Sequence, residues 1–92
     1  MYRFEYRPQF LRDIKRLKRK HYDMQKLYTV IDDLEKYDIE LLKRHYHDHA
    51  LQGNLKGYRE LHIDADWLLI YSIDKDRLCL ILTRTGNHNT VL

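Results

Sequence analysis

This sequence of 92 residues has few of the residues that mark disulfides, flexible linkers and membrane spans. It contains one cysteine, one proline and three glycines. The single cysteine, Cys79, has no partner for an internal disulfide and lies in the apolar run LCLIL, which predicts a buried thiol in a reducing cytoplasm. No apolar run is long enough to cross a membrane, and the first residues are polar and charged, so we expect neither a span nor a signal peptide. The length fits one domain, residues 1–92, in the cytoplasm.

The charge of the chain is distributed unevenly. Hydrophobic residues make up 43% of the sequence, enough to bury a small core, and the net charge is +3. Residues 1–28 hold nine Lys and Arg against three acidic residues, whereas residues 29–42 hold one Lys against five acidic residues. A basic patch of this kind favours binding to a polyanion such as nucleic acid, and it equally fits an ordinary solvated helix face.

Two amphipathic helices are predicted after a short N-terminal strand. Residues 2–6 alternate aromatic and charged side chains, as in a strand. Pro8 suits the first turn of a helix, in which Phe10, Ile14 and Leu17 share one apolar face. Asp23 is a predicted N-cap for a second helix that ends near residue 37. The short link between them predicts an antiparallel helical hairpin.

Three strands are predicted in the second half, over residues 58–63, 67–73 and 77–83. The LLIY run of the middle strand predicts burial on both faces and hence a central position. Residues 39–42 fit a helical turn, residues 45–56 are predicted to be a loop, and residues 84–92 a polar tail. The predicted fold class is α+β, an antiparallel sheet of the N-terminal strand plus three C-terminal strands, packed on a two-helix hairpin. We expect the other face of the sheet to be open.

Several polar side chains are predicted to converge on that open face. Alternation along residues 58–63 directs Leu61 toward the helices and His62 away from them. The remaining candidates come from the loop before the sheet, the turn after residue 63 and the end of the last strand: His49, Asp66, Trp67, Arg84 and His88.

These residue types fit the cleavage of RNA without a metal ion. Histidine has an unperturbed pKa of about 6.5, so two histidines can act as general base and general acid near neutral pH. An arginine can stabilise the charge that develops on a phosphate, and an exposed tryptophan offers a stacking surface to a base. The ribose 2′-hydroxyl then attacks the adjacent phosphate.

Structural explanations exist for the same residues. Trp67 fits an ordinary core position, and Arg84 fits an edge-strand charge. His45, His47 and His49 have the spacing of a transition-metal site, but no second cluster of ligands has a diagnostic spacing, so no metal and no other cofactor is predicted.

Two segments of the sequence resemble a known family. The run HDHALQGNLKGYRELHIDADWLLIY, followed by RTGNH, is similar to the YafQ branch of the RelE/ParE toxin superfamily. The hallmarks of that branch, approximately D-H-x-L-x-G-x-x-x-G-x-R-x-x-H-x-x-x-D-W-x-L-I-Y and R-T-G-x-H, match residues 48–71 and 84–88. The resemblance implies a RelE-like, microbial-RNase-like α+β fold and a toxin of a type II toxin–antitoxin system that cuts messenger RNA in the ribosomal A site.

The resemblance also implies roles for individual residues. His49, His62, Asp66 and His88 take the acid–base positions, and we predict His49 as the base and His88 as the acid. Arg84 takes the phosphate-stabilising position, and Trp67 helps to position the RNA. One position departs from the pattern, since a family member has an aromatic residue where this chain has Leu92, which predicts weaker stacking on a base.

The resemblance implies three partners: a cognate antitoxin, ribosomal RNA and messenger RNA. The basic first helix is the predicted docking face for ribosomal RNA, through Lys15, Arg16, Arg19 and Lys20. Two alternative functions stay open, a ParE-like inhibitor of DNA gyrase and a catalytically inactive binding module. The histidine set argues against the first, and the sequence does not decide the second.

Overall fold

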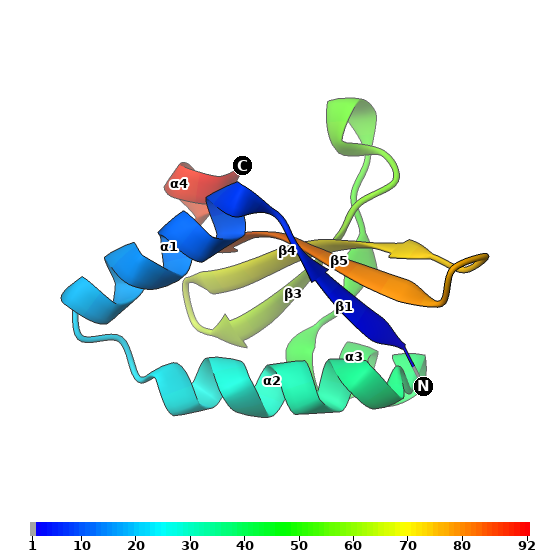
Figure 1. Ribbon diagram of the computed structural model, residues 1–92, viewed down its shortest axis with the longest axis horizontal. Helices are drawn as coiled ribbons and strands as arrows, with labels where there is room; N and C mark the ends of the chain where they lie inside the picture. The colour runs from blue at the N-terminus through cyan, green and yellow to red at the C-terminus, as the bar shows by residue number, and fades with distance from the viewer. Residues whose placement is uncertain (1) are drawn as a thin grey trace.

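The computed structural model describes residues 2–92, which form a mixed sheet with helices on both of its faces (Figure 1). In chain order the elements are β1 (Arg3–Tyr6), α1 (Pro8–Arg19), α2 (Met24–Lys36), α3 (Ile39–Tyr46), β2 (His49–Ala50), the 3-10 turn η1 (Gly53–Leu55), β3 (Arg59–Asp64), β4 (Trp67–Asp74), β5 (Cys79–Gly86) and α4 (His88–Val91). The predicted α+β class is confirmed. Within these residues, no helix has the length and apolarity needed to cross a membrane.

The sheet has the order β1-β5-β4-β3-β2, so β4 is central, as its apolar run predicts. The pairs β2–β3, β3–β4 and β4–β5 are antiparallel, whereas β1 runs parallel to β5. The expectation of a wholly antiparallel sheet is therefore wrong at one edge. The short strand β2, which falls in the predicted loop, adds a further pair at the other edge.

One face of the sheet carries the main core. Phe10 of α1, Val30 and Leu34 of α2, and Leu69 and Tyr71 of β4 belong to one buried cluster. Figure 1 shows α2 and α3 on one side of the sheet and α4 on the other, with α1 diverging from α2 after their short link. The predicted N-cap is confirmed, since Asp23 accepts a hydrogen bond from the Gln25 N–H, and α2 ends at Tyr37 in a left-handed conformation.

Several features of the second half differ from the prediction. α3 continues to Tyr46, so His45 lies on a helix instead of in a loop. β5 continues to Gly86, and the predicted tail forms α4 beyond it. The second face of the sheet is also not fully open, because Val91 of α4 packs there against buried residues of β4. His45 and Tyr46 at the end of α3 and the four residues of α4 are weak helix formers, so propensity does not predict a helix at these positions.

Candidate functional site

Two of the predicted histidines lie together on the second face of the sheet, which we call the outer face. His49 of β2 and His62 of β3 have ring centroids 6.3 Å apart. His49 lies directly across the strand pair from Glu60, and His62 follows Glu60 by two positions, so all three side chains share one face. The structure therefore places His62 on the face that its alternation predicts.

The tautomer of neutral His49 is set by a backbone carbonyl. Its Nδ1 lies 2.7 Å from the carbonyl oxygen of His47, so Nδ1 donates its proton there. The Nε2 of the neutral ring is then free to accept a proton. His47 ends α3 in a left-handed conformation, and its own ring packs edge-on against His62 at 5.9 Å.

Asp48, which lies between His47 and His49 in the sequence, anchors this segment in the interior of the protein. Its side chain is fully buried and accepts hydrogen bonds from the Arg59 guanidinium, at 2.7 Å, and from the Tyr71 hydroxyl. Burial of Arg59 lowers the pKa of its guanidinium, and the contacts with Asp48 outweigh this effect and raise it. Burial and the Asp48 carboxylate both raise the pKa of the Tyr71 hydroxyl. The network fixes β2, and with it His49, against β3 and β4.

Removal of the Tyr71 hydroxyl tests whether this network stabilises the fold. Tyr71→Phe should lower the free energy of unfolding by about 1.5–3 kcal/mol, because Asp48 loses one hydrogen bond to a buried charge. Urea denaturation measures the change. Tyr28→Phe is the matched control, since Tyr28 is 42% exposed. Equal effects of the two substitutions would show that the Tyr71 hydroxyl contributes nothing to stability.

The turn between β3 and β4 places a second pair of predicted residues together. Asp66 accepts a hydrogen bond from the backbone N–H of His88 at 3.3 Å, which ties the turn to the start of α4. The side chains of Asp66 and His88 are both exposed. His62, Leu68 and Gly86 occupy one row across β3, β4 and β5, so His62 and Gly86 are about 10 Å apart. The two groups of candidates thus lie at the same end of the sheet.

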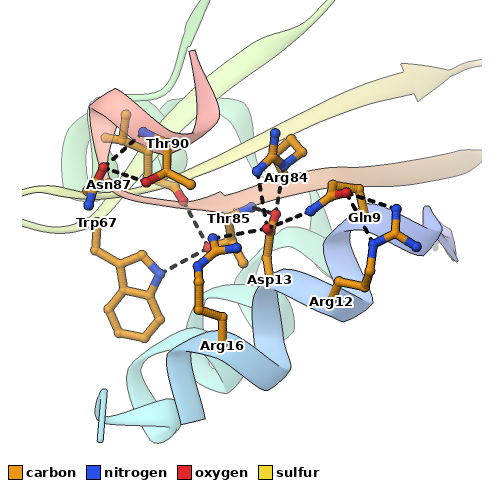
Figure 2. A network of polar contacts seen from close by, with 10 residues as sticks. Gln9, Arg12, Asp13, Arg16, Trp67, Arg84, Thr85, Asn87 and Thr90 are labelled. Atoms are coloured by element: carbon orange, nitrogen blue, oxygen red, sulfur yellow. Dashed lines mark hydrogen bonds and ion pairs between the residues drawn. The ribbon is translucent and has the colours of Figure 1, made fainter. Parts of the chain in front are cut away.

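Trp67 does not provide an exposed stacking surface, and that expectation is wrong. The side chain is 4% exposed and packs with Leu17 and Leu27 beneath the sheet. Tyr22 meets its ring edge-on at a centroid distance of 4.9 Å. Its indole N–H donates to the Thr85 hydroxyl at 2.9 Å (Figure 2). As the first residue of β4, Trp67 alternates with Leu68 and so faces the helices.

Arg84 is held by a buried carboxylate that the sequence interpretation did not identify. Its Nε and Nη2 donate to the two oxygens of Asp13 on α1, at 2.8 and 3.2 Å (Figure 2). Asp13 also accepts the backbone N–H of Thr85 at 3.0 Å and lies 3.0 Å from the Arg16 guanidinium. Two of the five N–H groups of Arg84 are thereby used, and three stay available to another anion.

These contacts decide the charge state of Asp13. Its full burial raises the pKa of the carboxyl, but the hydrogen bonds from Arg84, from the Thr85 N–H and from Gln9 outweigh burial, so the pKa lies below its ordinary value. One sequence signal was available for this residue. Asp13 lies on the same helical face as Phe10 and Leu17, where a lone acid needs a buried partner.

The predicted docking residues, in α1 and directly after it, have different surroundings. Lys15, Arg19 and Lys20 are exposed, and no ion pair within residues 2–92 engages them. Arg16 instead turns toward Asp13 and the end of β5. A Cβ at Gly86 would lie 3.3 Å from the Arg16 Nη2 and 3.2 Å from a methyl of Val91, which explains a glycine there. Leu92, at the end of α4, is 44% exposed.

Open hollows flank the turn between β3 and β4. One hollow of about 310 Å³ is bordered by Asp66, Trp67 and Asn87 together with the start of α2. Another, of about 380 Å³, is bordered by His45, His47 and His62. Asp64 and Ala65 form the ridge between the two. Among residues 2–92, no three His, Cys, Asp or Glu side chains are preorganised to hold a metal ion.

Comparisons with known proteins agree on one family. Residues 2–92 match the family described as the bacterial toxin of type II toxin–antitoxin systems, YafQ. The chain is 42% identical to the mRNA interferase toxin YafQ of Escherichia coli K12 over 84 residues, which cover 91% of this chain and 88% of that protein.

Solved structures agree in fold. The structure of YafQ from E. coli BL21(DE3) superposes with a TM-score of 0.89 at 36% identity, over 100% of this chain and 99% of that one. A metal-bound toxin from Helicobacter pylori gives the same TM-score and identity, with full coverage of both chains. The toxin of the E. coli DinJ–YafQ complex superposes with a TM-score of 0.83 at 35% identity, over 100% and 99% of the chains.

Proposed function

Because this chain belongs to the YafQ family of bacterial toxins from type II toxin–antitoxin systems, we propose that it is an endoribonuclease that cleaves messenger RNA in the ribosomal A site. The observation that carries the proposal is the pair of histidines on the outer face, His49 and His62, at the same end of the sheet as His88. These groups can move protons near neutral pH, as cleavage by the ribose 2′-hydroxyl requires.

His49 is the general base in this mechanism. The His47 carbonyl holds the Nδ1 proton of His49, so the Nε2 lone pair takes the proton of the 2′-hydroxyl. The 2′-oxygen then bonds to phosphorus, and the bond from phosphorus to the 5′-oxygen of the next nucleotide breaks. His62, whose ring lies beside His49, assists in the same proton transfer.

His88 is the general acid. It protonates the leaving 5′-oxygen, and so prevents the expulsion of an unstable alkoxide. Asp66 positions His88 by accepting the N–H of its backbone. The exposed ring of His88 at the start of α4 is free to reach a bound phosphate.

Arg84 stabilises the negative charge on the phosphate during the reaction. Asp13 orients the guanidinium and leaves three of its N–H donors for phosphate oxygens. Leu92 borders the same end of the molecule, and its aliphatic side chain gives a weaker stacking contact to a base than an aromatic one. The buried Trp67 supports Thr85 on the strand that carries Arg84, and does not contact RNA as a stacking surface.

Docking uses the basic helix. Lys15 and Arg19 of α1, and Lys20 directly after it, are exposed and bind phosphates of ribosomal RNA, so affinity for the ribosome falls as salt rises. The second partner is a cognate antitoxin, as the complex of the E. coli relative with DinJ suggests.

The test is primer extension on a reporter messenger RNA that is translated in the presence of the purified protein. We expect cuts at a fixed position within codons when ribosomes are present, and none without them. The cuts should persist in EDTA at a Mg²⁺ level that still supports ribosomes, because the mechanism needs no metal ion in the protein. If selective chelation of transition metals abolished cleavage, the metal-free mechanism would be wrong.

Two outcomes would contradict the whole proposal. A folded protein that cleaves no messenger RNA under either condition would favour a binding module. Inhibition of DNA supercoiling by gyrase, measured in parallel, would favour the ParE-like alternative.

A further inference from the structure

A buried carboxylate lies between the two histidines of the outer face. Glu60 is 5% exposed. Its Oε2 lies 3.5 Å from the Nε2 of His49, and its Oε1 lies 3.6 Å from the Nε2 of His62. Each carboxylate oxygen thus faces the proton-transferring nitrogen of one ring.

Within the described residues 2–92, the only basic side chains beside Glu60 are two histidines. The ion pairs there join Glu60 to His49 and His62 and to no lysine or arginine. The neighbouring Arg59 is engaged by Asp48 on the other side of the strand. A buried carboxylate is rarely kept without a basic partner, and the rings of His49 and His62 are the basic groups beside Glu60.

Packing does not account for an acid at this position. Opposite Glu60 on β4 lies Ile70, which belongs to an apolar cluster with Leu68 and Val91. A leucine or valine would extend that cluster at no cost in desolvated charge. The carboxylate therefore has a reason other than the stability of the sheet.

We propose that Glu60 is a positioning residue of the nuclease, and this inference rests on the proposed function. Its two oxygens lie 3.5 and 3.6 Å from the Nε2 atoms of His49 and His62, so the carboxylate can meet an N–H that forms at either Nε2. When His49 takes the proton of the 2′-hydroxyl, Glu60 stabilises the imidazolium that forms. Glu60 touches neither the phosphate nor the ribose.

Glu60→Gln tests the proposal, because the amide keeps the size of the side chain and removes its charge. We expect kcat for cleavage of ribosome-bound messenger RNA to fall about 10- to 100-fold, with little change in KM, because the base is misplaced while docking is intact. The dependence of kcat on pH should differ from that of the parent protein, because an amide cannot balance the charge of an imidazolium beside it. Glu60→Asp, which keeps the charge, should restore the parent profile. Glu40→Gln, on the exposed face of α3, is the control.

A second readout does not depend on activity. Histidine side-chain ¹⁵N spectra report the tautomer and the protonation of each ring, and we expect Glu60→Gln to change the signals of His49 and His62 and Glu40→Gln to change neither. Unchanged signals of both rings in Glu60→Gln would overturn the proposal, as would a fall in kcat with an unmoved pH profile. If the parent protein cleaves no messenger RNA, the proposed function fails, and the ¹⁵N spectra still decide whether Glu60 positions the rings.

Discussion

Replacing His88 by alanine should lower the rate of messenger-RNA cleavage by about 10²- to 10⁴-fold, the range that a general acid contributes. The fold should survive, because the side chain is exposed and Asp66 contacts only the backbone N–H of residue 88. Primer extension under single-turnover conditions measures the rate. Thermal melting should give the same midpoint as the parent protein within a degree or two.

Two further variants make this result specific. His88→Gln keeps a polar side chain of similar length but cannot give up a proton, so it should be as inactive as the alanine variant. His21→Asn is the control, because His21 lies in the link between α1 and α2 with a φ of 64°, a conformation that asparagine tolerates. Full activity in His88→Gln would mean that residue 88 binds RNA and transfers no proton.

Replacing Asp13 by alanine should lower the free energy of unfolding by about 3–5 kcal/mol, as when one partner of a buried ion pair is removed. The substitution leaves Arg84 and Arg16 facing each other without their shared anion. It also leaves the backbone N–H of Thr85 without its acceptor. No strand can replace that acceptor, because β1 pairs with β5 only as far as Leu82. Urea denaturation measures the loss, and Asp76→Ala, in the exposed turn before β5, is the control.

The same residue should affect stability in acid. The folded pKa of Asp13 lies below its ordinary value, because the contacts with Arg84 and Thr85 outweigh the effect of burial. Its contribution to stability is therefore complete above a pH of about 4, the unfolded value, and is lost as the pH falls through the folded one. Asp13→Asn should flatten the dependence of the unfolding free energy on pH below about 4. An identical acid dependence in the variant and the parent would contradict the charged state of Asp13.

The local elements of this protein could be predicted from its sequence. The apolar face of α1, the N-cap at Asp23 and the central strand with its LLIY run all follow from patterns that repeat within one element. The position of His62 on the outer face follows from alternation in the same way. These patterns are readable because each depends on neighbours only a few residues away.

The family was also readable from the sequence, through the two motifs at residues 48–71 and 84–88, and residues 2–92 match it. The roles of the individual site residues stay predictions, because side chains that match a motif do not by themselves show which proton each one moves. The experiments on His88 and Glu60 separate those roles.

Only the tertiary structure decided the long-range contacts. β1 and β5 lie at opposite ends of the chain, and the alternation within each strand carries no information on whether the pair is parallel. The residue type of Trp67 favours a core position, the family resemblance suggests a contact with RNA, and only the packing of Trp67 with Leu17 and Leu27 decides for the core. The pairing of Asp13 with Arg84 and the place of Glu60 between two histidines depend on how helix and strands pack. The sequence by itself thus determined the first two helices, the main strands and the family, because these depend on local patterns. Packing determined which charges meet, because partners such as Asp13 and Arg84 are brought together only when the chain folds.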